Sequence, residues 1–262
     1  MLLTMDMGNT NITVGVFEKD ALLFEARLMT DHARTGDEYA VLLHNILRLH
    51  DVEPSAFEGA VICSVVPSLD NALQRAVLSV TGCTPLFVGP GTRTGVNIRL
   101  DDPAQLGADL LVGAVAAIAR YGAPCAVWDL GTATTVSVVG RDGSFLGGVI
   151  LPGVVTSYDA LSTRTSLLPH VRLQTPPRVI GRNTNDSMRS GAVFGTAAIV
   201  DGVTDRIEKE IGCPVKVIIT GGLGREIAGQ CLHPNVYDNE LLLEGLRLIW
   251  EKNLRTPAEK NE

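Results

Sequence analysis

Two stretches of the sequence place a carboxylate at the end of an apolar run and follow it with a polar, glycine-containing turn. The first is MDMGNTNITVGVF, in which Asp6 precedes the turn, and the second is WDLGTATTVSVV, in which Asp129 holds the same place. The backbone N–H groups of such a turn can hold phosphate oxygens, and nearby Asn or Thr side chains can add to them. The aspartate can hold a cation, because hard cations prefer oxygen ligands. These residue types indicate polyphosphate binding.

A single hairpin of this kind also fits an ordinary turn, in which Asp and Asn are frequent. The same order of residues recurs, however, with Asp6 and Asp129 separated by nearly half of the chain. A repeat over that distance favours the functional interpretation and indicates two related domains instead of a short-period repeat. The expected domains are residues 1–120 and 121–262.

Strands and helices alternate around both stretches, which predicts an α/β fold with a parallel or mixed sheet in each half. Each hairpin is predicted to be followed by a return strand. A long helix is predicted just before the second hairpin, with Asp102 as its cap, Pro103 in its first position and Gly122 past its end. The segment NELLLEGLRLIW has helical periodicity and is expected to form a C-terminal packing or dimer helix.

A third element, VKVIITGGLGREIAG, reads as a buried strand, a Gly-Gly turn and a helix. The turn at Thr220, Gly221 and Gly222 could let a flat adenine lie against the backbone. A tight strand-to-helix turn would need the same glycines, so both interpretations stay open at this point.

Composition narrows the class of partner. The chain has 262 residues, 45% hydrophobic and 19% charged, with a formal net charge of -7. This acidity argues against a nucleic-acid partner, which requires an excess of Lys and Arg, but it does not exclude a nucleotide. The apolar runs are too short or interrupted to span a bilayer, so no membrane partner is expected. Five scattered cysteines suggest neither disulfides nor zinc, and a reducing cytoplasm fits best.

The two hairpins and the later turn together resemble the actin, Hsp70 and sugar-kinase superfamily. The resemblance implies two duplicated ribonuclease H-like domains with ATP in an interdomain cleft. Within this superfamily, nearly the whole chain resembles type III pantothenate kinases, a family also described as Bvg accessory factors. The matching motifs are Asp6 and Gly8 to Thr10; Asp37 to Tyr39; Ser64 to Pro67; Thr94 and Gly95; Pro103; Gly107 to Asp109; Asp129 to Thr135; Gly147 to Gly153; Ile180 to Thr184; and Thr220 to Gly222.

This resemblance implies ATP-dependent phosphorylation of pantothenate to 4′-phosphopantothenate, the first step of coenzyme A biosynthesis. It also implies Mg²⁺, a monovalent cation (K⁺ or NH₄⁺) held by Asp129, and a homodimer. Asp109 would be the base that accepts the proton of the pantothenate hydroxyl. The residues implied to bind ATP are Asp6, Met7, Gly8, Asn9, Thr10, Asn11, Ile12, Thr13 and Thr132. The residues implied to contact pantothenate are Gly107, Ala108, Asp109, Leu110 and Thr184, the last across the dimer interface.

From the residues alone, Asp109 could also be a solvated helix residue. Its neighbour Gly107 favours the catalytic interpretation, because glycine is costly inside a helix and usually marks a close backbone approach. Three positions depart from the family pattern: Leu110 replaces an arginine that contacts substrate, Ser137 replaces an aspartate, and Leu100 replaces a frequent tyrosine. Two alternatives therefore stay open, a regulatory nucleotide-binding protein without turnover and a kinase of another small alcohol.

Overall fold

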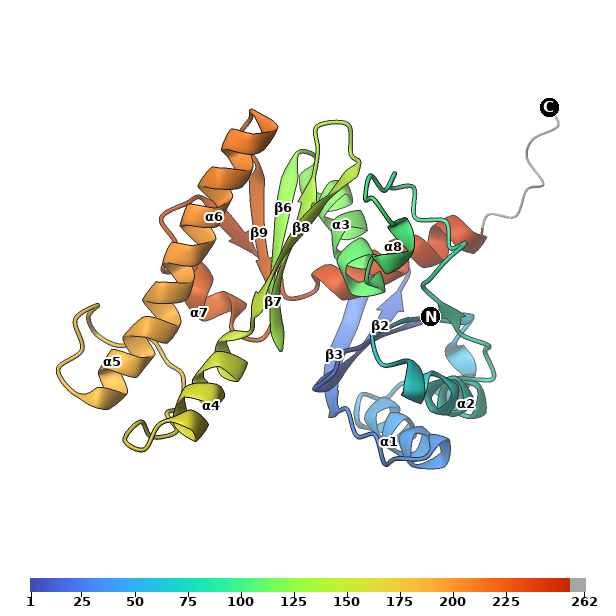
Figure 1. Cartoon of the computed structure of the whole chain (residues 1–262). Coiled ribbons are helices and arrows are strands. Elements are labelled where there is room, and N and C mark those ends of the chain that lie inside the picture. The colour runs from blue at the N-terminus through green and yellow to red at the C-terminus, as the bar shows by residue number, and fades with distance from the viewer. Residues whose placement is uncertain (255–262) are drawn as a thin grey trace. The chain divides into compact units, whose positions relative to one another are not determined.

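The computed structural model describes residues 1–254, and its contacts divide the chain into two units (Figure 1). Unit 1 contains residues 1–95, 104–116 and those from 242 onward, and unit 2 contains residues 96–103 and 117–241. The expected cut between residues 120 and 121 differs from this division mainly at α8 (Leu241–Leu254). Gly15 and Gly59 on the sheet of unit 1 leave room for Leu243 and Trp250 of this helix, which explains why it belongs there.

Unit 1 is built on a five-stranded sheet in the order β3-β2-β1-β4-β5. The central strand β1 pairs antiparallel with β2 and parallel with β4. The strands are β1 (Leu2–Met7), β2 (Asn11–Glu18), β3 (Ala21–Met29), β4 (Gly59–Ser64) and β5 (Leu86–Phe87). Because side chains alternate along a strand, Leu3, Met5 and Met7 face the core while Asp6 faces the opposite side of the sheet.

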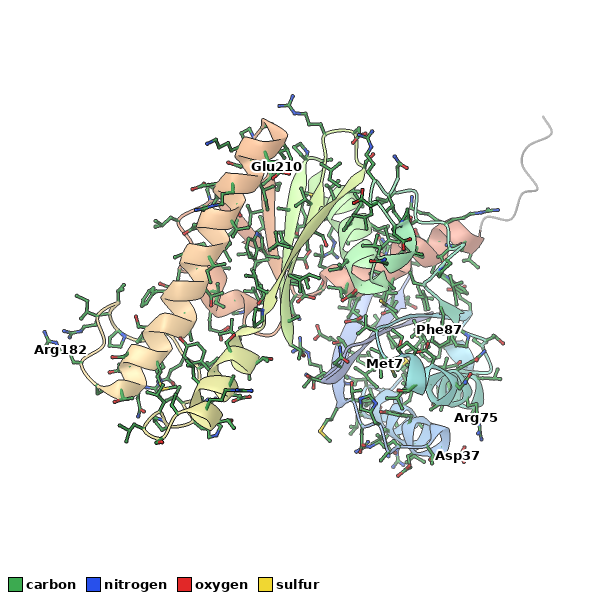
Figure 2. All side chains as sticks on the ribbon, viewed as in Figure 1. Met7, Asp37, Arg75, Phe87, Arg182 and Glu210 are labelled. Atoms are coloured by element: carbon green, nitrogen blue, oxygen red, sulfur yellow. The ribbon has the colours of Figure 1, made fainter. Side chains whose placement is uncertain are left out.

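Two helices cover the core face of this sheet, α1 (Gly36–Leu49) and α2 (Asp70–Thr81). A capping box starts α1, since the Thr35 hydroxyl accepts from the Glu38 N–H while the Glu38 carboxylate accepts from the Thr35 N–H. The two helices lie side by side, and at their exposed edge Asp37 and Arg75 are 3.7 Å apart (Figure 2). Short 3₁₀ turns lie at Pro54–Ala56, Pro67–Leu69 and Pro103–Gln105.

Unit 2 repeats the same sheet plan. Its order is β8-β7-β6-β9-β10, again three strands joined by antiparallel pairing followed by two added in parallel. The strands are β6 (Cys125–Leu130), β7 (Ala133–Val139), β8 (Phe145–Pro152), β9 (Lys216–Thr220) and β10 (Asn235–Tyr237). The helices are α4 (Val154–Arg164), α5 (Thr184–Ser190), α6 (Thr196–Ile211) and α7 (Gly224–Ala228), with a π-helical turn at Gly191–Gly195 between α5 and α6. Trp128 is the largest fully buried side chain of the core of unit 2.

The helix expected to begin at Asp102 begins later, so that prediction is wrong at its start. Pro103 opens a separate 3₁₀ turn, and the α-helix α3 runs over Ala108–Tyr121. Gly107 lies between the two and breaks the helical run. Asp109 consequently lies in the first turn of α3 instead of its interior. No helix within residues 1–254 is long and apolar enough to cross a membrane.

Candidate functional site

The first predicted hairpin is formed by β1 and β2 of unit 1. Asp6 pairs with Thr13 and Met7 pairs with Ile12, which leaves residues 8–11 as the turn. The Gly8 N–H donates to the Asn11 carbonyl at 3.0 Å and closes this turn. Met7 and Ile12 are fully buried in the core, so only their backbone could reach a ligand. The side chains of the turn residues Asn9, Thr10 and Asn11 are exposed.

The carboxylate of Asp6 lies beside a buried cysteine. Cys63 of β4 is in register with Asp6, and neighbours in register point to the same face of a sheet. The thiol forms a hydrogen bond with the Asp6 carboxylate. Burial raises the pKa of Cys63 far above its usual range, and the negative charges of Asp6 and Asp109 add to the effect. The charge of Asp109 therefore acts on the same thiol as the charge of Asp6.

Asp109 itself is half-buried at the start of α3. Burial raises the pKa of this carboxyl, while hydrogen bonds from backbone N–H groups partly oppose the shift. One of these is the Leu110 N–H, which donates to Oδ1 at 2.9 Å. A Cβ on Gly107 would lie 2.5 Å from the same oxygen, so this glycine gives the carboxylate its room. The close approach at Gly107 is thus made by the Asp109 carboxylate, and the catalytic role of Asp109 stays a prediction.

The second predicted hairpin is formed by β6 and β7 of unit 2. Asp129 pairs with Thr135 and Leu130 pairs with Thr134, which leaves residues 131–133 as the turn. The Gly131 N–H donates to the Ala133 carbonyl at 3.1 Å. Asp129 is also in register with Thr220 of β9. Two threonines thus flank this aspartate on its own face of the sheet, and the group offers the oxygen ligands that a hard cation prefers.

The Gly-Gly turn follows β9 and touches the same aspartate. Gly221 has φ +92°, a conformation that favours glycine, and a Cβ there would lie 2.6 Å from both Asp129 Oδ1 and the Leu130 nitrogen. Backbone geometry and close packing therefore account for Gly221. Gly222 has no atom within 4 Å of where its Cβ would be. A role for this turn beside adenine stays a prediction.

The residues expected around the acceptor lie in both units. Leu110 is half-buried in the first turn of α3 in unit 1. Thr184 is the exposed first residue of α5 in unit 2, where Asn183 caps the helix by accepting from the Asp186 N–H at 2.8 Å. Ser137 is 2% exposed on β7, so a carboxylate at that position would be buried.

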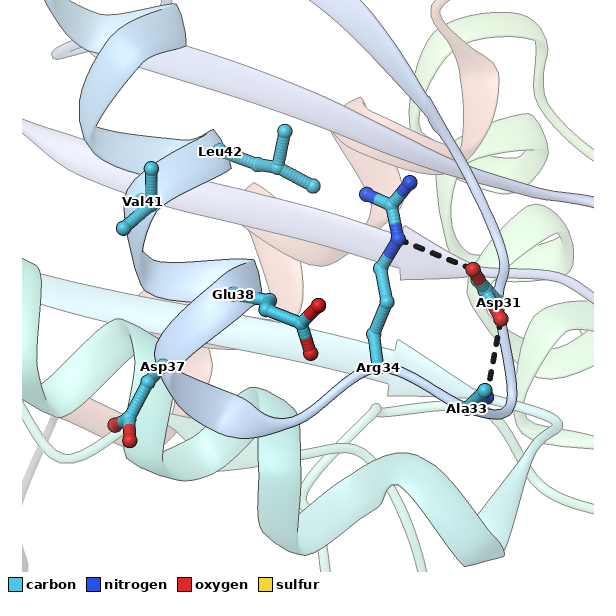
Figure 3. A pocket seen from close by; sticks show the side chains of 7 residues that line it. All are labelled: Asp31, Ala33, Arg34, Asp37, Glu38, Val41 and Leu42. Atoms are coloured by element: carbon cyan, nitrogen blue, oxygen red, sulfur yellow. Dashed lines mark hydrogen bonds and ion pairs between the residues drawn. The ribbon is translucent and has the colours of Figure 1, made fainter.

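A pocket of about 550 Å³ opens elsewhere in unit 1, around the start of α1 (Figure 3). It is lined by Asp31, Ala33, Arg34, Asp37, Glu38, Val41 and Leu42, and it contains none of the predicted site residues. Its arginine is already engaged, since Arg34 Nε lies 3.2 Å from Asp31 Oδ2. We do not assign this pocket to the reaction.

One group in unit 2 was not indicated by the sequence, in which the histidines form no ligand spacing. Asp205, Glu208 and His233 place one ligand atom each within 4.8 Å of one another. His233 Nε2 is 3.4 Å from Glu208 Oε1, which also accepts from the Val215 N–H at 2.8 Å. This group connects α6 to the segment before β10. Contacts between residues so far apart in the sequence cannot be recognised from the spacing of residue types.

The family model of type III pantothenate kinases matches residues 2–206 of this chain. The chain belongs to the type III pantothenate kinase family. Relatives called type III pantothenate kinase include one from Anaeromyxobacter sp. (strain Fw109-5), 43% identical over 97% of this chain and 100% of that protein. Another, from Shouchella clausii (strain KSM-K16), is 44% identical over 97% of this chain and 100% of that protein. The resemblance found in the motifs is confirmed.

Solved structures show the same fold. A Baf-family transcriptional activator from Campylobacter jejuni superposes with a TM-score of 0.58 at 20% identity, over 97% of this chain and 100% of that chain. A 2-dehydro-3-deoxygalactonokinase protein from Sinorhizobium meliloti gives a TM-score of 0.58 at 13% identity, over 100% of both chains. With the two matching five-stranded sheets, these likenesses confirm the predicted fold, a pair of ribonuclease H-like domains.

Proposed function

We propose that this chain phosphorylates pantothenate with ATP to give 4′-phosphopantothenate, the first step of coenzyme A biosynthesis. Its membership in the type III pantothenate kinase family supports the proposal. The structural observation that carries it is a half-buried carboxylate, Asp109, in the first turn of α3, with room made for it by Gly107. The match of Gly107 to Asp109 with the family motif gives this carboxylate its proposed role.

Asp109 is the proposed base. Burial raises its pKa, which makes it a better proton acceptor than an exposed aspartate. The proton of the attacking hydroxyl would move to the Asp109 carboxylate as the oxygen bonds to the γ-phosphorus and ADP leaves. Phosphoryl transfer depends mostly on alignment and charge neutralisation, so a positioned carboxylate is a sufficient base.

The turn of each unit is proposed to bind ATP phosphates. In unit 1 the run from Asp6 to Thr13 contributes its backbone and the exposed side chains of the turn, and in unit 2 Thr132 contributes. Asp6 would hold Mg²⁺ or its water shell, and the bound ion would neutralise phosphate charge. Asp129, with Thr135 and Thr220 in register beside it, would hold K⁺ or NH₄⁺.

The acceptor site is proposed to include Gly107, Ala108, Asp109, Leu110 and Thr184. Thr184 would contribute across a homodimer interface. Exposed apolar side chains in unit 2 support such an interface, because several large apolar residues shortly before Thr184 in the sequence are exposed to solvent. They are Val155, Leu161, Leu167, Val179 and Ile180, of which Leu167 is 88% exposed and Ile180 is 80% exposed.

Light scattering tests the dimer. Leu167→Glu combined with Ile180→Glu should convert the protein to a monomer with impaired pantothenate use, since charge is costly in an apolar interface. Leu49→Glu is the matched control, because Leu49 is an equally exposed apolar residue, at 80%, that belongs to unit 1. A wild-type protein that is monomeric and fully active at assay concentration would contradict the dimer.

The reaction itself is tested by incubating purified protein with ATP, Mg²⁺, K⁺ and pantothenate and identifying 4′-phosphopantothenate by mass spectrometry. ADP release that depends on pantothenate would support the proposal. ATP binding without pantothenate-dependent turnover would favour a regulatory protein. Turnover with a different alcohol in a substrate panel would favour another kinase.

A further inference from the structure

One residue holds two carbonyls of the turn in unit 1. Thr30 follows β3 and is only 9% exposed. Its hydroxyl donates to the Gly8 carbonyl at 2.7 Å, and its N–H donates to the Thr10 carbonyl at 2.9 Å. The Thr10 bond continues the pairing of β2 with β3, whereas the hydroxyl bond to Gly8 is an addition that only the Thr30 side chain supplies.

A threonine holds the turn of unit 2 in the same manner. The Gly153 N–H donates to the Thr132 carbonyl at 3.1 Å, which continues the pairing of β7 with β8. In the first turn of α4, the Thr156 hydroxyl donates to this same carbonyl at 2.9 Å. Each turn therefore receives one backbone bond and one threonine hydroxyl bond on its carbonyl oxygens.

These bonds fix the direction of particular N–H groups. A peptide unit is planar and trans, so its C=O and N–H point in opposite directions. Holding the Gly8 carbonyl thus aims the Asn9 N–H away from Thr30, and holding the Thr132 carbonyl aims the Ala133 N–H away from Thr156. Phosphate oxygens are recognised by turn N–H groups whose direction is set before the ligand arrives.

We propose that Thr30 and Thr156 are positioning residues for the phosphate turns, each acting through its hydroxyl on a turn carbonyl. The inference rests on the proposed function of the turns. Neither threonine touches the phosphate. Each acts by keeping the backbone N–H groups of its turn in their binding direction, which lowers the cost of ordering them when ATP binds.

Removal of the Thr30 hydroxyl and removal of the Thr156 hydroxyl should weaken nucleotide binding by different amounts. The Thr30 hydroxyl is the side-chain partner of the Gly8 carbonyl in a part-buried setting, and a valine there would leave that carbonyl without this donor. Thr156 is exposed, and its acceptor keeps the bond from Gly153 when the hydroxyl is removed. Loss of the Thr30 hydroxyl should therefore be felt more than loss of the Thr156 hydroxyl.

The experiment measures ADP and ATP binding with Mg²⁺ by calorimetry, together with unfolding temperature, for Thr→Val and Thr→Ser variants at both positions. Thr30→Val should weaken binding by about tenfold and Thr156→Val by roughly threefold. Serine keeps the hydroxyl, so Thr30→Ser and Thr156→Ser should restore affinity to within about twofold.

Thr81→Val is the matched control. The Thr81 hydroxyl donates to the Val77 carbonyl at 2.8 Å inside α2, so it also makes a hydroxyl-to-carbonyl bond but belongs to neither turn. This variant should lower the unfolding temperature without changing nucleotide affinity. If Thr30→Val folds poorly, the Thr156→Val variant still tests the positioning role, because Thr156 is exposed.

Two further variants separate the inference from the proposed function. Asp6→Asn and Thr132→Val change groups proposed to act on the phosphates or their ion directly. If these leave nucleotide affinity unchanged, the turns do not bind phosphate and the proposed site fails. If they weaken binding while well-folded Thr30→Val and Thr156→Val match the wild type, the positioning role alone is overturned.

Discussion

The hairpin of unit 1 leaves four residues between Met7 and Ile12, whereas the hairpin of unit 2 leaves three between Leu130 and Thr134. Both put an aspartate at the end of a central strand. The side chains in register with it differ, being a threonine and a cysteine for Asp6 but two threonines for Asp129. The two units thus repeat one sheet plan with different chemistry around the carboxylate.

The difference indicates that the two copies of the motif have different chemical roles. Asp6 has a thiol donor beside it, and the charge of a second carboxylate, Asp109, acts on that thiol. Asp129 instead lies among hydroxyl oxygens and against the backbone at Gly221. An environment with two acidic groups favours proton transfer and divalent-ion chemistry, and one of neutral oxygens favours a monovalent cation.

The largest expected effect comes from the carboxylate in the first turn of α3. Asp109→Asn should lower kcat by at least about a hundredfold, because a general base contributes roughly that much or more. Nucleotide affinity should change little, since Asp109 belongs to neither turn. Steady-state kinetics with pantothenate and calorimetry with ADP make the measurement. Near wild-type turnover in the purified variant would show that Asp109 is not the base.

The same variant should be more stable than the wild type at neutral pH. Burial raises the pKa of Asp109 in the folded protein above its unfolded value, so ionisation costs stability as pH rises through that window. Asparagine removes this cost and can still accept from the Leu110 N–H. The difference in unfolding temperature should be positive at pH 7, shrink as the pH falls through the raised folded pKa, and be smallest below about pH 3, where the carboxyl is protonated in both states. If the difference in unfolding temperature did not depend on pH, the ionisation of Asp109 would not be its cause.

The second hairpin is expected to be sensitive to a different change. A Cβ at Gly153 would overlap the carbonyl oxygens of Gly131 and Thr132, and backbone atoms of a turn cannot yield as a flexible side chain can. Gly153→Ala should therefore weaken ATP binding by more than about tenfold, since displaced turn carbonyls move the N–H groups of the turn. Calorimetry with ADP checks this.

Gly195→Ala is the control for that variant. Gly195 lies in helical backbone, and no atom is within 4 Å of where its Cβ would be. This control should bind nucleotide as the wild type does and be slightly more stable. Wild-type affinity in a folded Gly153→Ala protein would show that the second turn tolerates displacement or does not bind phosphate.

The two hairpins could be predicted from the sequence because each is formed by residues that are close together in the chain. The apolar run, aspartate, glycine and polar turn predict each hairpin, and the structure contains both. The start of α3 could not be read in the same way. Asp102 and Pro103 satisfy the signals for a helix start, yet they produce only a 3₁₀ turn before Gly107. Local signals indicate that a turn begins but not how far it propagates.

Contacts between residues far apart in the sequence were even harder to predict. Thr30 lies twenty-two positions from the carbonyl that its hydroxyl holds, and Cys63 lies on a strand that reaches Asp6 only through sheet pairing. The packing of α8 on unit 1 depends on the missing side chains of Gly15 and Gly59. Such contacts depend on tertiary packing, so they could not be predicted from residue type or spacing.

A cation requirement would sharpen the contrast between the two aspartates. Activity should be several-fold higher in K⁺ or NH₄⁺ than in Na⁺, because the smaller ion would demand a tighter oxygen cage around Asp129. Asp129→Asn should remove the difference between K⁺ and Na⁺, whereas Asp6→Asn should lower activity in both. Equal wild-type activity in sodium-only and potassium buffers would remove the proposed cation from unit 2.

The smallest expected effect concerns Leu110, where the family pattern has a substrate-contacting arginine. Arginine can hold a carboxylate or amide oxygen by charge-assisted bonds of about 1.5 to 3 kcal/mol each, and leucine cannot. Other arginines are engaged elsewhere: Arg99 is 2.5 Å from Asp142, and Arg189 donates to the Arg172 carbonyl at 3.2 Å. By contrast, Arg182 is exposed at the edge of unit 2 (Figure 2).

Because Leu110 is only half-buried, solvent should screen most of an added charge, and Leu110→Arg should lower the KM for pantothenate by roughly threefold. The KM for ATP should not change, since Leu110 belongs to neither turn. Leu110→Met, similar in volume but uncharged, separates the charge from the change in shape and should keep the wild-type KM. An unfolded arginine variant beside a folded methionine variant would place Leu110 in the core. Unchanged kinetics in a folded arginine variant would show that this position does not face the substrate, and the acceptor site would then rest on Asp109 and Thr184.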